Sequence, residues 1–401
     1  MITVAELIER FKPALLQRYA PRLLPSHYQA LAAMKRCRTR FAPRMLIACA
    51  ACGEQRSVPH SCGHRACPHC QHHDSQRWLQ RQLHSLVPAP YFLVTFTLPA
   101  ELRGLASRHQ RLVYALLMQC AWDTLDTFTR NDARLSATPG AVGVLHTHNR
   151  RLDFHPHVHM VMPAAALDAQ RGLWRTKVRR ARSTGAGAAS AASGPYLFNH
   201  KALAKVFRAK VLDAVERAGL QLPAVLPETW VVDCRCVGDG SKALLYLGRY
   251  LYRGVIQEAD ILRCDNGLVS FRYRDAKTGK SAVRTLPGAD FLWLMLQHVL
   301  PKGLRRARNF GFLHHNSAAK VRLLQVLHLR GASAGQAASP GQAAPMPTRQ
   351  AWRCVCGQPM HVVQRRMPAQ PFDACARMRS SPLVRPAKPD KPEPAPARTM
   401  H

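Results

Sequence analysis

The sequence is poor in acidic residues and has no long hydrophobic run. Asp and Glu number 23 against 58 Lys and Arg, so the formal net charge is +35. This excess is spread along the whole chain, and it favours a polyanionic partner, with nucleic acid preferred over an anionic membrane surface. The longest apolar stretches fall short of a transmembrane helix. The first residues also lack the parts of a secretory signal peptide, so we expect a cytoplasmic protein.

Motifs for nucleotide chemistry are absent as well. The sequence contains no G-x-x-x-x-G-K-[ST] loop, which argues against a P-loop nucleotide cofactor. It has no helicase-type motif of the kind found in large replication initiators, and it has no internal repeat. With 47% hydrophobic residues over 401 positions, the chain is nevertheless able to bury a sizeable core.

Cysteine, by contrast, is abundant and clustered. Thirteen cysteines in a cytoplasmic chain indicate metal sites or free thiols rather than disulfides. Two C-x2-C pairs, Cys49 with Cys52 and Cys67 with Cys70, have the spacing of a tetrahedral structural zinc site. We expect this zinc to stabilise a DNA-contacting module. Alternative fourth ligands are Cys62, His60, His64 and His69. The short R-C-V-C-G stretch at Cys354 and Cys356 has no second pair nearby, so we assign no zinc to it.

A histidine-rich stretch runs from Phe154 to Ala164. Side chains two residues apart share one face of a strand, so His155, His157 and His159 line one side. Three imidazoles on one face are suited to a divalent metal, although a His-rich surface strand is the alternative. Residues 141–148 read as a neighbouring strand, and a hairpin would bring His146 beside this face.

The stretch from Ser241 to Ile256 reads as a helix. Tyr246 and Tyr250 stand four residues apart and share a face, as do Arg249 and Arg253. Tyrosines in such positions are often half-buried packing residues. A catalytic role is indicated only if they lie beside the histidine strand. Further along, basic residues alternate with aromatic ones, a pattern that suits phosphate contacts and base stacking; the basic positions are Lys302, Arg305, Arg306 and Arg308.

Composition and periodicity suggest three regions. Residues 1–84 form a helical, zinc-binding and DNA-contacting domain, and residues 85–325 form a mixed α+β domain that carries the histidines and tyrosines. Within it, residues 183–194 read as a flexible insert. Residues 326–401 are rich in Pro and Ala and are expected to be a disordered tail.

Several motifs, in order, resemble one known group of enzymes. They include S-C-G-H-R-A-C-P-H-C-Q, L-H-T-H-N-R-R-L-D-F-H-P-H-V-H and Y-L-G-R-Y-L-Y-R-G-V-I, and the resemblance covers most of residues 30–325. The group is that of the HUH-superfamily tyrosine transposases of rolling-circle insertion sequences, especially the common-region (ISCR) type. The resemblance implies an α+β fold in which an antiparallel sheet carries the histidines and packs against the tyrosine helix, after a small zinc-binding domain. Its two-histidine motif falls on His157 and His159, and its tyrosine motif on Tyr246 and Tyr250.

The resemblance also implies a chemistry. Mg²⁺ or Mn²⁺ would be held by His157, His159 and a third ligand, either His155 or His146. Tyr250 would attack single-stranded DNA of the bacterial nucleoid to give a 5′-phosphotyrosine, and Tyr246 would be available for a second strand. The alternatives are a replication initiator or relaxase with the same chemistry, and a zinc-stabilised DNA-binding protein without catalysis.

Overall fold

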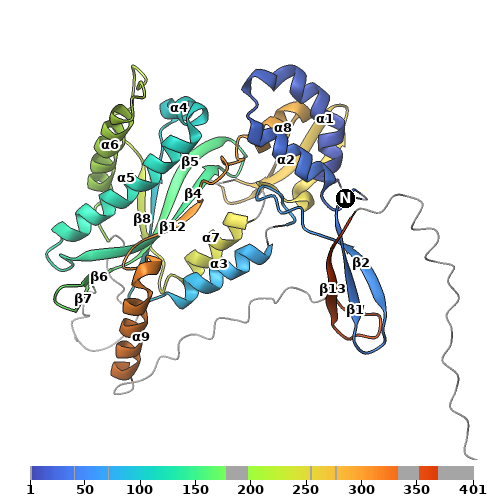
Figure 1. Ribbon diagram of the computed structural model, residues 1–401. Coiled ribbons are helices and arrows are strands. Elements are labelled where there is room, and N and C mark those ends of the chain that lie inside the picture. Colours follow the sequence, from blue (N-terminus) through green and yellow to red (C-terminus); the bar gives the residue numbers. More distant parts are fainter. Residues whose placement is uncertain are drawn as a thin grey trace, which may run out of the picture.

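The computed structural model describes residues 2–39, 41–70, 72–177, 197–252, 255–275, 278–332 and 352–368, and it has the expected mixed α+β fold (Figure 1). The helices are α1 (Val4–Tyr19), α2 (Pro25–Arg36), α3 (His72–His84), α4 (Arg103–Arg108), α5 (Gln110–Asn131), α6 (His200–Arg217), α7 (Ser241–Tyr252), α8 (Gly288–Leu296) and α9 (Ala318–Ala332). The strands are β1 (Arg44–Cys49), β2 (Gln55–Pro59), β3 (Tyr91–Thr97), β4 (Thr138–His148), β5 (Phe154–Pro163), β6 (Ala165–Asp168), β7 (Leu173–Thr176), β8 (Val232–Cys236), β9 (Ile261–Asp265), β10 (Leu268–Arg274), β11 (Ser281–Pro287), β12 (Ala307–Gly311) and β13 (Met360–Met367).

The largest sheet is antiparallel and has the strand order β7-β6-β4-β5-β3-β8, with β12 paired to β4. The expected hairpin of β4 and β5 is confirmed, and it lies in the middle of this sheet. Along β5 the side chains alternate between two cores. Val158, Met160 and Met162 enter the core under α5, whereas Val161 continues the histidine row into the core under α7. The two central strands therefore place the histidines on the α7 face.

Helices cover both faces of this sheet. The long helix α5 and its neighbour α6 pack on one face, where Tyr114, Leu117 and Phe207 are fully buried. On the other face α7 and α3 lie side by side, with Leu244 and Leu247 packed against Trp78. The Ser75 hydroxyl donates a hydrogen bond to the Gly248 carbonyl at 2.9 Å, which fixes α3 to α7. The tyrosine helix is thus held between the sheet and a second helix.

A second core joins the start of the chain to its later part. Helices α1 and α2 pack on α8 and on the meander β9-β10-β11, around Ile8, Leu31, Phe271 and Phe291. The pairs Asn266-Gly267 and Thr278-Gly279 are typical of hairpin turns, and from the sequence we expect them to mark the two turns of such a meander, as the structure confirms. Glu258 accepts a hydrogen bond from the backbone N–H of Val4 at 2.7 Å and so ties the first turn of α1 to this part. The structure therefore groups residues 4–37 with 256–299, whereas we expected a separate domain over 1–84.

A third, small sheet lies apart from the large one, with the strand order β13-β1-β2 (Figure 1). Its strand β13 and the end of α9 both fall in the region expected to be a disordered tail, so that expectation is wrong for residues 326–332 and 352–368. The expected insert at 183–194 lies outside the described residues. Among the helices that are described, none has the length and apolar character needed to cross a membrane.

Candidate functional site

Three histidines meet at the centre of the large sheet. His157 and His159 lie on β5, and His146 on β4 is the cross-strand partner of His157. Their ligand nitrogens all lie within 4.8 Å of one another. The ring centroid of His146 lies 4.3 Å from that of His159 and 5.0 Å from that of His157. The register of the hairpin, rather than the spacing along β5 alone, brings these imidazoles together.

Hydrogen bonds orient the rings of this histidine cluster. The Nδ1 of His157 lies 2.7 Å from the His155 carbonyl, which only accepts, so Nδ1 carries the proton and Nε2 keeps its lone pair. The Nδ1 of His159 lies 2.9 Å from the Thr95 hydroxyl on β3. The Nε2 of His146 is buried and has no hydrogen-bond partner among the described residues. A buried nitrogen without a partner is costly, and a ligand at the cluster would satisfy it.

His155 does not join the cluster. Its Nδ1 lies 2.8 Å from Nη2 of Arg103, and its ring centroid lies 5.2 Å from that of His157. Of the two candidates for a third ligand, the geometry therefore brings in His146.

Burial keeps the clustered imidazoles neutral. It lowers the pKa of His157 to about 4, and it lowers the pKa values of His146 and His159 well below the usual value, with further lowering from the neighbouring histidines. Next to the cluster, burial lowers the pKa of His148 to about 4, and it lowers the pKa of His298 well below the usual value. Neutral imidazoles are the form that binds a metal ion, so the donor set matches a cation site.

Helix α7 lays Tyr250 across the cluster. The Tyr250 ring stacks on His146 with 3.3 Å between centroids and lies 4.9 Å from the ring of His148. Its hydroxyl is buried and makes no well-formed hydrogen bond to any of the described residues, although the backbone at Thr147 and His148 faces it. Burial raises the pKa of Tyr250, while the positive charge of Arg306 acts in the opposite direction.

Tyr246 lies one turn earlier on α7 and is 51% exposed. It lines a hollow of about 830 Å³ whose wall also includes His159 and Thr95. Three cations from different elements line the same hollow: Arg150 after β4, Arg235 on β8 and Lys242 on α7. The sequence reading missed these three residues, because only the folded sheet brings them beside the histidines.

The basic residues expected to contact DNA separate into groups. Arg306 turns toward the cluster and donates from Nη1 to the Leu251 carbonyl at 3.1 Å. Arg305 and Arg308 instead line a larger groove of about 1410 Å³, together with arginines of α3, α5 and α9: Arg77, Arg81, Arg111 and Arg322. Arg249 is exposed on α7, and Lys302 is exposed in the loop before β12. Arg253 lies outside the described residues.

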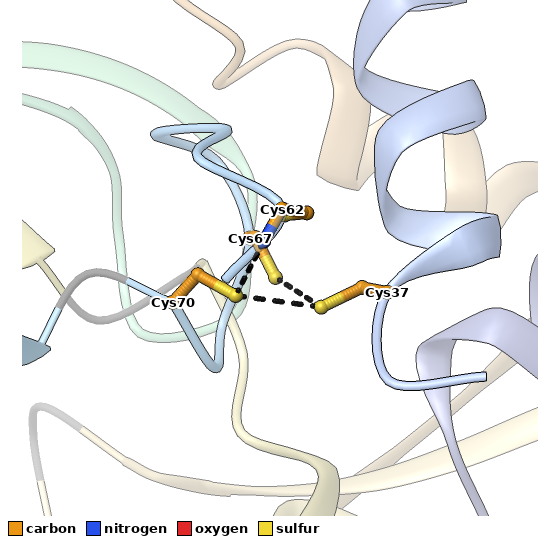
Figure 2. Close-up of side chains that lie close together, drawn as sticks. All are labelled: Cys37, Cys62, Cys67 and Cys70. Atoms are coloured by element: carbon orange, nitrogen blue, oxygen red, sulfur yellow. Dashed lines mark hydrogen bonds between the residues drawn. The ribbon is translucent and has the colours of Figure 1, made fainter. Parts of the chain in front are cut away.

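Four thiols from the end of α2 and the following loops converge at a second site (Figure 2). The Sγ atoms of Cys67 and Cys70 each lie 3.4 Å from that of Cys37, and the backbone N–H of Cys62 points at Cys70. The loop carrying these cysteines is anchored by Arg65, which donates to the carbonyls of Leu300 and Leu304 at 2.8 Å. This cysteine cluster therefore connects α2 to the segment that leads into β12.

The expected grouping of Cys49, Cys52, Cys67 and Cys70 is wrong. The structure places Cys67 and Cys70 with Cys37 and Cys62, and it places Cys49 and Cys52 with Cys354 and Cys356. The partners of Cys49 and Cys52 lie 307 and 302 positions away, and Cys37 lies 30 positions before Cys67, so spacing within the pairs did not reveal them. Cys62 was among the alternative ligands, whereas His60, His64 and His69 belong to neither cluster. His69 instead pairs with Glu258 at 3.0 Å.

Comparison with known proteins gives two family matches. Residues 7–98 match a family described as "Transposase zinc-binding domain", of the IS91 type, and residues 140–320 match one described as "Putative transposase". The first range contains the cysteines Cys37, Cys62, Cys67 and Cys70, and the second contains the histidine cluster with Tyr246 and Tyr250.

Two relatives share much of the chain. The "Putative transposase y4qJ" of Sinorhizobium fredii is 29% identical over 82% of this chain and 84% of its own length. The "Transposase for insertion sequence element IS801" of Pseudomonas savastanoi is 30% identical over 65% of each chain. No solved structure matches. The chain therefore joins an IS91-type transposase zinc-binding domain to a putative transposase domain.

Proposed function

We propose that this chain nicks and rejoins single-stranded DNA through a 5′-phosphotyrosine intermediate and so drives rolling-circle-type transposition. The observation that carries the proposal is the stacking of Tyr250 on His146, within a buried histidine cluster. A tyrosine and a set of neutral imidazoles at one point are what metal-assisted phosphoryl transfer to a tyrosine requires. The transposase matches support the same reading.

The histidine cluster fits a divalent cation, Mg²⁺ or Mn²⁺. His146, His157 and His159 offer three nitrogens close together, and the Nε2 of His146 is buried without a partner. When bound, such an ion supplies Lewis-acid stabilisation of the charge that develops on the scissile phosphate. The Thr95 hydroxyl and the His155 carbonyl hold the rings of His159 and His157 in place.

Tyr250 is proposed as the nucleophile. Its phenolic oxygen bonds to the phosphorus, the bond from phosphorus to the 3′ oxygen breaks, and the 3′ oxygen leaves as a free hydroxyl. Arg306 favours the phenolate, because its positive charge lowers a pKa that burial raises. The covalent link keeps the phosphodiester energy, so rejoining by a 3′-hydroxyl needs no nucleotide cofactor. Tyr246, on the open side of the same helix, is positioned for a second strand.

Single-stranded DNA is proposed to lie in the hollow beside α7. Arg150, Arg235 and Lys242 would contact its phosphates there. The larger groove with Arg305 and Arg308 would hold further DNA of the element ends. We place this reaction on nucleoid DNA in the bacterial cytoplasm.

The cysteine cluster of Figure 2 is proposed to hold a structural zinc ion. A tetrahedral zinc–thiolate site separates its sulfurs by roughly 3.8 Å, and the sulfurs of Cys67 and Cys70, each 3.4 Å from that of Cys37, are close to that value. Four cysteines leave no open position for a substrate, which is the pattern of a structural rather than a catalytic zinc.

The test is a nicking assay on single-stranded oligonucleotides from the element ends, with Mg²⁺ or Mn²⁺. We expect the wild-type protein to form a covalent adduct that resists denaturation. Tyr250→Phe should abolish this adduct. Tyr246→Phe should leave the first adduct intact and block the joining of a second strand. Tyr28→Phe, at an exposed position on α2, is the matched control and should change neither step.

If no end-derived strand forms an adduct, the proposed reaction is contradicted. The alternative of a zinc-stabilised DNA-binding protein without catalysis would then be favoured. An undiminished adduct in Tyr250→Phe, together with its loss in Tyr246→Phe, would exchange the roles of the two tyrosines.

A further inference from the structure

We propose that Cys49, Cys52, Cys354 and Cys356 form a second zinc site, which fastens the C-terminal strand β13 to the β1-β2 hairpin. The four thiols lie within 4.8 Å of one another, and Cys354 and Cys356 lie beyond both family matches. The zinc-binding match covers Cys49 and Cys52 but not their two partners, so neither match spans the whole cluster. The proposal does not depend on the proposed DNA chemistry.

The distances fit thiolate ligands rather than disulfides. The Sγ atoms of Cys49 and Cys356 are 3.6 Å apart, and those of Cys52 and Cys354 are 3.3 Å apart. A disulfide needs about 2.05 Å, whereas sulfurs around one tetrahedral zinc lie roughly 3.8 Å apart. Cys49 and Cys354 are buried, and Cys52 and Cys356 are exposed, so the site lies at the edge of the small sheet.

Each cysteine pair sits in a tight turn closed by a glycine, although the first pair is C-x2-C and the second is C-x-C. In the first turn the Gly53 N–H donates to the Cys49 carbonyl at 3.0 Å. In the second turn the Gly357 N–H donates to the Cys354 carbonyl at 2.9 Å. Each glycine directly follows the second cysteine of its pair and has a positive φ, +73° at Gly53 and +84° at Gly357. Two such turns facing each other are the arrangement that presents four thiolates to one ion.

Strand pairing brings these turns together. In the register of β1 with β13, Cys49 pairs with Met360, Ala48 with His361 and Ile47 with Val362. The second turn then folds back, because the Met360 N–H donates to the Trp352 carbonyl at 2.6 Å. Backbone hydrogen bonds alone therefore place both cysteine pairs at the same end of the sheet, independently of any contact between the thiols.

The small sheet has too little core to stand without a further stabilising interaction. Its hydrophobic cluster consists of the buried residues Ile47, Cys49, Cys354 and Met360, and among the described residues Val58 and Trp352 pack against them. Modules of this size usually need a metal or disulfides, and zinc binding supplies folding free energy directly. Two of the four core residues are themselves cysteines of the cluster, so the core and the proposed metal site coincide.

The test measures zinc in the purified full-length protein by elemental mass spectrometry. We expect about two zinc ions per chain in the wild type, one at each cysteine cluster. The double variant Cys354→Ser with Cys356→Ser should lose about one of them. The matched control is Cys236→Ser with Cys264→Ser, which removes two cysteines outside both clusters and should keep both ions.

A conservative replacement distinguishes ligation from a mere effect on folding. Cys356→His should retain the second zinc, because histidine is an accepted ligand in place of one cysteine, whereas Cys356→Ser should lose it. In the wild type, Cys354 and Cys356 should resist alkylation until a chelator is added. Two outcomes would overturn the proposal: unchanged zinc in the double serine variant, or a wild-type mass showing disulfides in place of the metal.

Discussion

At the scale of single residues, the histidines of β4 and β5 differ in their contacts although they look alike in sequence. His146 is 2% exposed and stacks on Tyr250, and its Nε2 has no hydrogen-bond partner in the part of the chain that the structure describes. His155, two residues before His157, is instead engaged with Arg103. The difference arises because β4 and β5 pair with His146 opposite His157, so the third imidazole comes from the neighbouring strand.

This difference gives a paired prediction. His146→Ala should lower the rate of DNA cleavage by about 100-fold or more, because metal assistance contributes several kcal/mol to such reactions. His155→Ala should keep most of the activity, and it serves as the matched control on the same face. Cleavage rates across a Mn²⁺ titration measure both effects. Equal losses in the two variants would contradict the assignment of His146.

At the scale of elements, the start of α7 depends on one glycine. Gly240 has φ +82°, and a Cβ there would lie 2.6 Å from the ring of Tyr91. Gly238, two residues earlier, also has a positive φ of +66° but has open space around it. In the turn between β8 and α7, a side chain at position 240 would therefore meet both backbone strain and a steric clash. A side chain at position 238 would meet backbone strain alone.

We expect Gly240→Ala to lower the free energy of unfolding by about 2 to 4 kcal/mol, from left-handed strain plus a steric clash. Gly238→Ala should cost only about 1 kcal/mol, from strain alone. Urea denaturation of the two variants measures the difference. Because α7 carries both tyrosines, Gly240→Ala should also reduce adduct formation. Equal destabilisation in the two variants would mean that the contact with Tyr91 is relieved at no cost.

At the scale of the whole molecule, positive charge gathers in a groove made by α3, α5, β12 and α9. Among the residues that line it are six arginines and three histidines, with no Asp or Glu: Arg77, Arg81, His84, Arg111, Arg305, Arg308, His314, His315 and Arg322. Polyanion binding to such a surface releases counterions, so its affinity depends on salt.

The double variant Arg305→Ala with Arg308→Ala should bind DNA more weakly at every sequence. Its plot of log affinity against log salt should be shallower by about 1 to 2 units, as two phosphate contacts are lost. The control is Arg130→Ala with Arg217→Ala, which removes the same charge from exposed helix positions already paired with Asp126 and Asp213. An unchanged slope in the first variant would remove the groove from the DNA path.

Local patterns predicted the elements of the fold better than its long-range associations. The β4-β5 hairpin, the tyrosine helix and the meander follow from alternation, helical spacing and turn residues. The cysteine partners did not, because Cys37 and Cys354 reach their clusters through packing between distant segments. For the same reason the sequence suggested separate first and last regions, whereas α1 shares a core with α8, and β13 pairs with β1.

The pairing of β1 with β13 also sets an order of events during synthesis. Cys52 and Cys354 are 302 positions apart, so at roughly 5–20 residues per second the ribosome needs about 15–60 s to pass from one to the other. During that time the β1-β2 hairpin has been made, but its third strand and two of its four thiols have not. A chain that stops before residue 352 lacks β13 and two of the four cysteines. The complete three-stranded sheet can therefore form only after β13 has been translated.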